Sequence, residues 1–142
     1  MADLSPTQAI HGGAGVVIVD GVCGEALTAK DAVYKSSSDS KWYQLDVDSA
    51  PDVAAMLSDR NGVVGICMFG GSTDATVPIA IRGPIDMGTV FTAGVAYYAS
   101  DAAGKIRPAA DNGSGDSLVF LGTARTTSVL YLYPVYHGAA LA

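Results

Sequence analysis

The chain of 142 residues has little positive charge, with 8 Lys and Arg against 14 Asp and Glu and a net charge of -6. Proteins that bind nucleic acid neutralise its phosphates with lysine and arginine, so we expect no nucleic-acid partner. The sequence also lacks any run of 18 apolar residues, which a membrane-spanning helix needs. Its first residues lack the basic and apolar regions of a secretory signal. We therefore expect no membrane partner and synthesis in a cytoplasm.

Cysteine and histidine are equally scarce: the chain has only Cys23, Cys67, His11 and His137. Their spacing matches no zinc motif, so we predict no metal site from them. Both cysteines lie beside apolar runs, and a chain of this length can bury a core without a disulfide. This pattern predicts two buried free thiols.

Catalytic motifs are absent or incomplete. Gly115-Asp116-Ser117-Leu118 spells the nucleophile block of GDSL-type esterases, but that block normally lies near the N-terminus with an Asp three residues before the catalytic His. Here Pro134 stands three residues before His137. The glycine cluster at 11–15 is followed by neither a Gly-x-Ser-x-Gly elbow nor a Gly-Lys-Ser/Thr loop. We predict no enzyme, no catalytic residues and no cofactor.

One segment predicts a short helix at 49–58. Ser49 is suited to cap its N-terminus with Asp52 in the capping-box position, and Asn61-Gly62 would end it. Asp46, Asp48, Ser49 and Asp52 could also gather oxygens around calcium, but their spacing misses the EF-hand pattern. The capping explanation is the simpler one.

The rest of the composition favours β-structure, since 17 glycines and seven tyrosines accompany short runs of β-branched residues. A repeat organises these runs. The segment 24–36 (GEALTAKDAVYKS) aligns without a gap with 88–100 (GTVFTAGVAYYAS), 64 residues further on. The match continues from 63–65 to 120–122 at a spacing of 57, and from 76–81 to 128–133 at 52. Self-similarity of this kind predicts one β-unit built twice, with shorter loops in the second copy.

We therefore predict an all-β fold of two similar units, about 16–83 and 84–138, related by a pseudo-twofold operation in a compact barrel or sandwich. Together they form a single β domain at 16–142, preceded by an extended N-terminal arm at 1–15. Asp20-Gly21 is expected to be a hairpin turn and Arg82-Gly83-Pro84 the turn between the units. The expected strands are 16–19, 32–35, 41–45, 63–69, 76–81, 96–99, 105–108, 118–124 and 128–133.

These blocks resemble the small β-rich proteins that decorate the heads of tailed bacteriophages, the capsid cement proteins, and related phage head-fibre β-domains. The resemblance rests on the 27–35 and 91–99 blocks, the turn at 102–106 and the 119–124 strand. It implies a non-enzymatic structural protein on the outer capsid surface of the virion, bound to the major capsid protein as a homotrimer. The alternative from another class is a receptor- or carbohydrate-binding β-module of a phage fibre or tail, with Trp42, Tyr43, Tyr97 or Tyr98 as stacking platforms.

Two segments are candidates for partner binding. In the arm, Leu4, Pro6 and Ile10 are spaced apolar anchors that could add to a neighbour's strand edge. Near the C-terminus, Tyr131, Tyr133 and Tyr136 alternate with aliphatic residues and supply more aromatic surface than a core of this size needs. We expect part of that surface in the homotrimer interface.

Overall fold

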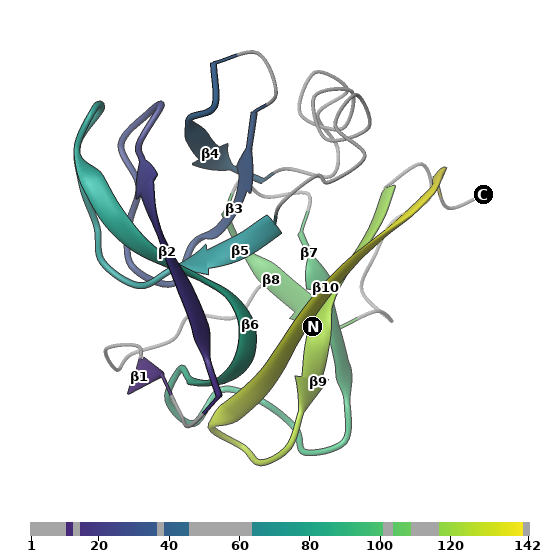
Figure 1. Ribbon diagram of the computed structural model, residues 1–142. Helices are drawn as coiled ribbons and strands as arrows, with labels where there is room; N and C mark the ends of the chain where they lie inside the picture. The colour runs from purple at the N-terminus through teal and green to yellow at the C-terminus, as the bar shows by residue number, and fades with distance from the viewer. Residues whose placement is uncertain are drawn as a thin grey trace.

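The computed structural model describes residues 11–12, 15–36, 39–45, 64–100, 104–108 and 117–140. Within these ranges the chain is all β and contains no helix (Figure 1). The strands are β1 (His11–Gly12), β2 (Val17–Val22), β3 (Ala32–Lys35), β4 (Trp42–Gln44), β5 (Val64–Cys67), β6 (Thr76–Asp86), β7 (Ala96–Ala99), β8 (Ile106–Pro108), β9 (Ser117–Ala124) and β10 (Val129–Ala140).

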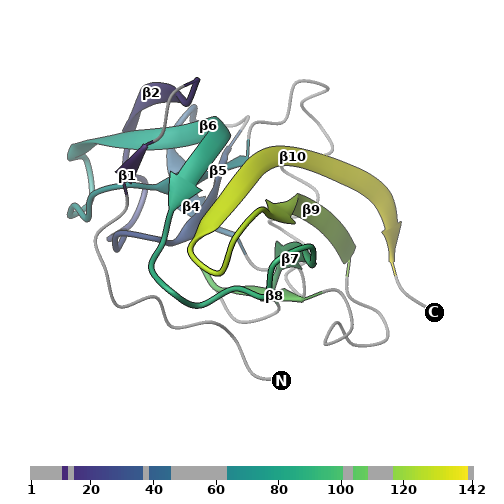
Figure 2. The ribbon, with the colours of Figure 1, turned by 90° about the horizontal axis from the view of Figure 1, so that it is seen from below.

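All ten strands belong to one curled antiparallel sheet. Eight follow the order β4-β3-β5-β6-β10-β9-β7-β8, and β1 and β2 both pair with β6. The long strand β6 joins two parts of the sheet: residues 76–82 pair with β2 and β5, while residues 83–86 pair with β10 and β1. Figures 1 and 2 show β6 curving between these two parts.

Gly83 lies at the point where β6 changes partners. Its φ of +102° is in the region that L side chains rarely adopt, and an added Cβ would come within 2.6 Å of the Val16 Cα. Only glycine allows both the bend and this close approach of the two backbones. Beyond the bend, β6 leaves β2 and β5 and pairs with β10 and β1.

The buried apolar side chains form two clusters. A smaller cluster fills the curl of the first part of the sheet, where a parallel bridge between Cys23 and Trp42 brings β4 back to the end of β2. Its buried members are Cys23, Leu27, Val33, Trp42, Cys67, Val77 and Ile79. A larger cluster joins both parts of the sheet, and includes Ala32, Tyr34, Ile66 and Ala80 from the first and Ile85, Tyr97, Leu121, Leu130 and Leu132 from the second.

The two parts of the sheet have the same strand order. In the first part it is β2-β6-β5-β3-β4, and in the second it is β6-β10-β9-β7-β8. The turns before the two hairpins also match: the Asp31 amide donates to the Thr28 carbonyl (3.1 Å), and the Val95 amide donates to the Thr92 carbonyl (3.2 Å). Each pair of positions is 64 residues apart, as in the sequence repeat.

The pairing of β6 with β5 and of β10 with β9 decides which side chains of these strands face the core. Ile79 pairs with Cys67 in one part of the sheet, and Leu130 pairs with Ala124 in the other. A shift of one residue moves every side chain to the opposite face of a strand. In the observed register Leu130 and Leu132 are buried, and Tyr131 and Tyr133 between them face outward.

The hairpins 32–45 and 96–108 and the remaining predicted strands are confirmed, although β6 and β10 run further than expected. Two predicted turns are wrong. Asp20-Gly21 lies inside β2, where Gly21 leaves room for the Trp42 ring and the Ile79 side chain, and Arg82-Gly83-Pro84 lies inside β6. The predicted helix at 49–58 and most of the predicted arm lie outside the described residues, but His11 and Gly12 of that arm pair with β6.

Candidate binding surface

Exposed apolar side chains concentrate on two strands. Among the residues that the structure describes, seven large apolar side chains are exposed, and six of them belong to β2 or β10. They are Val17, Ile18 and Val22 on β2, and Tyr131, Tyr133 and Val135 on β10; the seventh is Phe69. Strands β2 and β10 both pair with β6 and not with each other, so these side chains form two separate groups. Scattered apolar side chains are normal on a protein surface, whereas several gathered on one strand are a candidate binding surface.

The β10 group carries two arginines. The Arg125 guanidinium lies over the Tyr131 ring, 4.2 Å from its centroid, and the Arg82 guanidinium lies over the Tyr133 ring at 4.6 Å. Arg82 comes from β6, which pairs with β10, and Arg125 comes from the turn that joins β9 to β10. We call Arg82, Arg125, Tyr131, Tyr133 and Val135 the tyrosine–arginine face.

Strand pairing holds this face in place. Tyr131 lies opposite Pro84 of β6 on one side and opposite Thr123 of β9 on the other. On the reverse side of β10, Leu130 and Leu132 are fully buried in the larger core cluster. A tyrosine ring on a strand anchored in this way loses little conformational freedom on binding a partner.

The β2 group differs in charge. Because side chains alternate along a strand, Ile18, Asp20 and Val22 point to one side of β2. All three are exposed, so a carboxylate lies between two aliphatic side chains. We call these three residues the β2 face.

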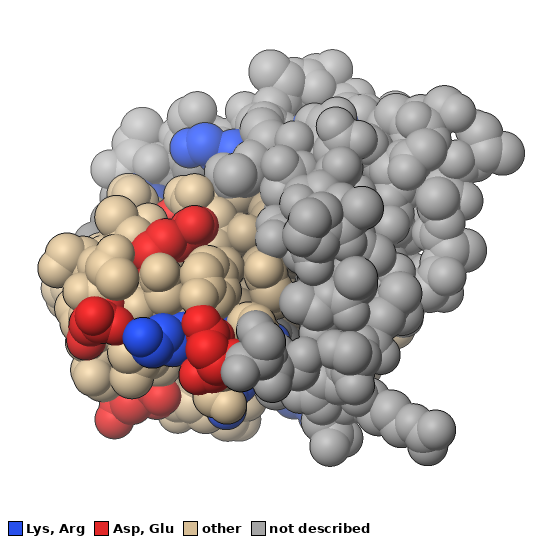
Figure 3. Space-filling model, turned by 90° about the horizontal axis from the view of Figure 1, so that it is seen from above, with Lys and Arg blue, Asp and Glu red and all other residues tan. Residues whose placement is uncertain are grey.

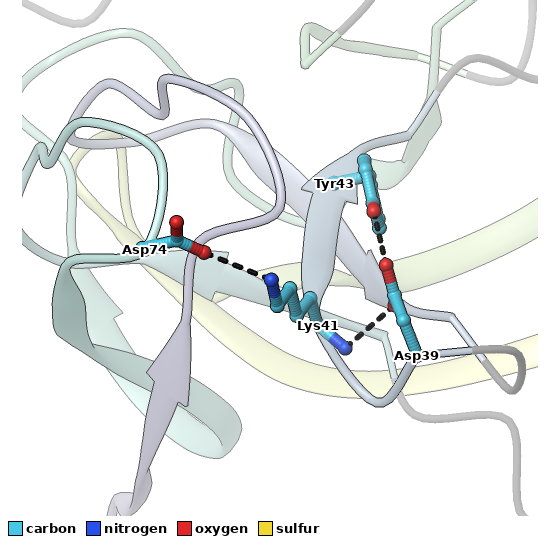
Figure 4. A network of polar contacts seen from close by, with 4 residues as sticks. All are labelled: Asp39, Lys41, Tyr43 and Asp74. Atoms are coloured by element: carbon cyan, nitrogen blue, oxygen red, sulfur yellow. Dashed lines mark hydrogen bonds and ion pairs between the residues drawn. The ribbon is translucent and has the colours of Figure 1, made fainter.

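A polar network lies near the turn between β3 and β4 (Figure 4). The Asp39 carboxylate accepts hydrogen bonds from the Tyr43 hydroxyl and from the Lys41 amide (2.9 Å), and Lys41 Nζ pairs with Asp74 Oδ1 at 2.8 Å. The bond from Tyr43 lowers the pKa of Asp39 and raises that of Tyr43, and the bond to Asp74 raises the pKa of Lys41. These shifts favour the protonation states that the groups already have near neutral pH, so the network fixes the turn and leaves no group suited to proton transfer.

Both thiols are free and buried, as predicted. Burial raises the pKa of Cys23 and raises that of Cys67 to about 11, while the Cys67 thiol donates to the Phe69 carbonyl (2.8 Å). A thiol with a raised pKa and no access to solvent is a poor nucleophile.

The described ranges contain no group of three His, Cys, Asp or Glu residues that could hold a metal ion. On the part of the surface seen from above, acidic side chains lie at separate places, with a basic side chain between two of them (Figure 3). Within the same described ranges, no helix is long and apolar enough to cross a membrane. Of the esterase-like block, Gly115 and Asp116 lie outside the described residues and Ser117 begins β9.

The predicted partner residues divide into two groups. Tyr131 and Tyr133 lie together on an exposed face, with 37% and 48% of each residue accessible. Tyr136 pairs with Val119 through β10, but its side chain is outside the described part of the chain, as are all of Leu4, Pro6 and Ile10. Arg82, Arg125 and the β2 face were not predicted from the sequence. The two-residue spacing of Ile18, Asp20 and Val22, which places them on one side of a strand, was a signal for the β2 face.

Two of the stacking platforms expected for a carbohydrate module are not available. Trp42 and Tyr97 are buried in the core, with 3% and 1% of each residue accessible. The Tyr43 hydroxyl is engaged by Asp39, and Tyr98 is half-buried with its ring edge-to-face against Phe120. Stacking on sugars requires an open ring face, so Trp42 and Tyr97 were wrong as platforms.

Comparison of the chain with protein-family models, with curated proteins and with solved structures gives no match. The candidate surface is therefore interpreted from its own geometry and chemistry.

Proposed function

We propose that this protein is a non-enzymatic structural protein of a phage virion, which decorates and stabilises the outer capsid surface by binding the major capsid protein. The observation that carries the proposal is the exposed, rigidly held tyrosine–arginine face on an all-β scaffold. Aromatic residues and arginine are the side chains most enriched at the centres of protein–protein interfaces. The resemblance of the repeat blocks to capsid decoration proteins supplies the kind of partner. In this proposal the protein is made in the host cytoplasm and acts on the virion.

The same proposal includes an internal duplication. The two units are the predicted halves, with β6 shared because its first part closes one unit and its second part opens the next. The common strand order and the matching turns support this interpretation, as does the conservation of backbone conformation at paired positions. Lys30 and Gly94 both have positive φ, at 79° and 84°, and so do Ser40 and Gly104, at 61° and 76°.

The proposed assembly on the capsid is a homotrimer, with Tyr131, Tyr133 and Tyr136 contributing to contacts between subunits or with the shell. The arm, with Leu4, Pro6 and Ile10, is the second proposed contact. An extended segment can add main-chain hydrogen bonds to a neighbour's strand edge and become ordered as it binds.

The test is a binding experiment with capsids of the phage that encodes the chain, prepared without this protein. The purified protein should co-sediment in many copies per particle and raise the temperature at which the capsid opens. Tyr133→Ala should weaken binding, whereas Phe69→Ala, which removes an exposed ring away from the tyrosine–arginine face, should not. Deleting residues 2–10 tests the arm and spares His11 and Gly12, which pair with β6.

A folded protein that does not bind such capsids would contradict the proposal. A few copies per virion, together with inhibition of phage adsorption by the purified protein, would instead support the receptor- or carbohydrate-binding alternative. Unchanged binding after the deletion would leave the arm without this role.

A further inference from the structure

We propose that the tyrosine–arginine face of one copy of this chain binds the β2 face of a second copy. This inference deepens the homotrimer part of the proposed function by naming two surfaces that meet. In it the tyrosine–arginine face serves the contact between subunits, so Tyr133→Ala weakens capsid binding by weakening the assembly. It does not depend on capsid binding, because it can be tested on the purified protein alone.

The first step is the state of the arginines. Each guanidinium is stacked on a tyrosine ring, and neither Arg82 nor Arg125 forms an ion pair with a carboxylate among the described residues. Stacking uses the flat face of a guanidinium and leaves its N–H groups at the edge free to donate. Each guanidinium held in this way can bind one carboxylate through two parallel hydrogen bonds.

The second step is the matching surface. Asp20 is exposed and has no hydrogen-bond or ion-pair partner in the described part of the chain. Ile18 and Val22 flank it on the same side of β2, each roughly 7 Å away along the strand. Tyr131 and Tyr133 are also two residues apart on a strand, so rings and aliphatic groups have the same repeat and can pack against one another.

The third step is that the two faces of one molecule cannot satisfy each other. Asp20 lies opposite Pro78 in β6, four residues before Arg82. Four residues of a strand span roughly 13 Å. The hydrogen bonds between β2 and β6 hold Asp20 at this distance from Arg82 along the sheet. An ion pair between Asp20 and Arg82 therefore requires a second copy of the chain.

The charge balance points to a second copy as the occupant. The chain is acidic overall, with a net charge of -6, yet both described cation–π pairs lie on the tyrosine–arginine face. An acidic copy of the same chain complements this face and brings apolar side chains beside the carboxylate. Because the two faces differ, the contact can occur twice in a two-fold dimer or once per subunit in a closed ring.

The experiment measures mass in solution by light scattering over a range of concentrations. The wild-type protein should show a multiple of its 14.4 kDa mass. Arg125→Glu, Arg82→Glu and Asp20→Arg should each weaken association by roughly tenfold or more, since each places like charges together. Combining Asp20→Arg with one of the two arginine reversals in the same chain should restore association, because opposite charges face each other again.

Lys105→Glu is the matched control, since Lys105 is exposed and belongs to neither face. Circular dichroism establishes that each variant is folded. A wild-type protein that stays monomeric at every concentration would overturn the inference. Association that survives all three single reversals, or that neither double variant restores, would also overturn it. A dimer would support the contact and contradict only the homotrimer.

Discussion

Replacing Gly104 by Ala tests how the two parts of the sheet are joined. The Gly104 amide donates to the Leu45 carbonyl (3.0 Å), and its carbonyl accepts from the Ala32 amide (2.9 Å). Gly104 precedes β8, in the second part of the sheet, whereas Ala32 and Leu45 belong to the β3–β4 hairpin of the first. This glycine therefore lies at a hydrogen-bonded junction of the two parts.

Two costs add at this position. The φ of +76° is unfavourable for alanine by about 1–2 kcal/mol. In addition, the new Cβ would lie 2.9 Å from Asp31 Oδ1 and 3.2 Å from Gln44 Nε2. Asp31 is buried and accepts hydrogen bonds from the Thr28 amide (2.8 Å) and from Gln44 Nε2 (2.9 Å), so displacing its carboxylate costs a further 1–3 kcal/mol or so. We expect Gly104→Ala to lower the free energy of unfolding by about 2–5 kcal/mol.

Gly94→Ala is the matched control. Gly94 has a similar φ of +84°, but an added Cβ would have no atom within 4 Å, so only the backbone cost of about 1–2 kcal/mol applies. Both variants can be measured by urea denaturation, followed by the fluorescence of the single tryptophan, Trp42, which is buried. Equal losses of stability in the two variants would refute the role assigned to Asp31 and to the junction.

Four further predictions concern the core and the surface. Trp42→Ala should lower the free energy of unfolding by about 3–5 kcal/mol, measured by circular dichroism in urea, because it empties the smaller core cluster; a loss below about 1 kcal/mol would show that the ring is not buried as described. Cys23 and Cys67 should react with a thiol reagent only after unfolding, and rapid labelling of the native protein would contradict their burial. Burial raises the pKa of Cys67 from 9.0 to about 11. The contribution of this thiol to the free energy of unfolding should be complete below pH 9 and should decline as the pH rises towards 11, because the thiol ionises more readily in the unfolded chain. A series of urea denaturations without a decline in that pH window would argue against the shift. Lys41→Ala should leave the midpoint of urea denaturation almost unchanged, because its ion pair with Asp74 is exposed to solvent, and a clear fall in the midpoint would mean that the pair is not screened.

Local patterns in the sequence were sufficient for much of the fold. The repeat predicted that 32–45 and 96–108 form hairpins, and both are antiparallel strand pairs. The apolar surroundings of Cys23 and Cys67 predicted buried free thiols. These features depend on side-chain alternation and turn residues within a few positions of one another, which a sequence displays directly.

Asp20-Gly21 and Arg82-Gly83-Pro84 have the composition of turns, and nothing local distinguishes them from turns. Their strand character comes from distant partners. Asp20 pairs with Pro78, and Gly21 faces Trp42 and Ile79 across the curl of the sheet. Gly83 bends β6 without ending it, because the strands on both sides continue to supply hydrogen bonds.

The candidate surface was accessible to sequence reasoning only in part. The sequence alone determined that Tyr131 and Tyr133 share one side of a strand, because that follows from the two-residue period. Which side faces the core depended on the pairing of Leu130 with Ala124, and a register different by one residue would have buried the tyrosines instead. Arg125 reaches Tyr131 within the local hairpin of β9 and β10, but Arg82 lies over Tyr133 only because β6, far away in the chain, pairs with β10.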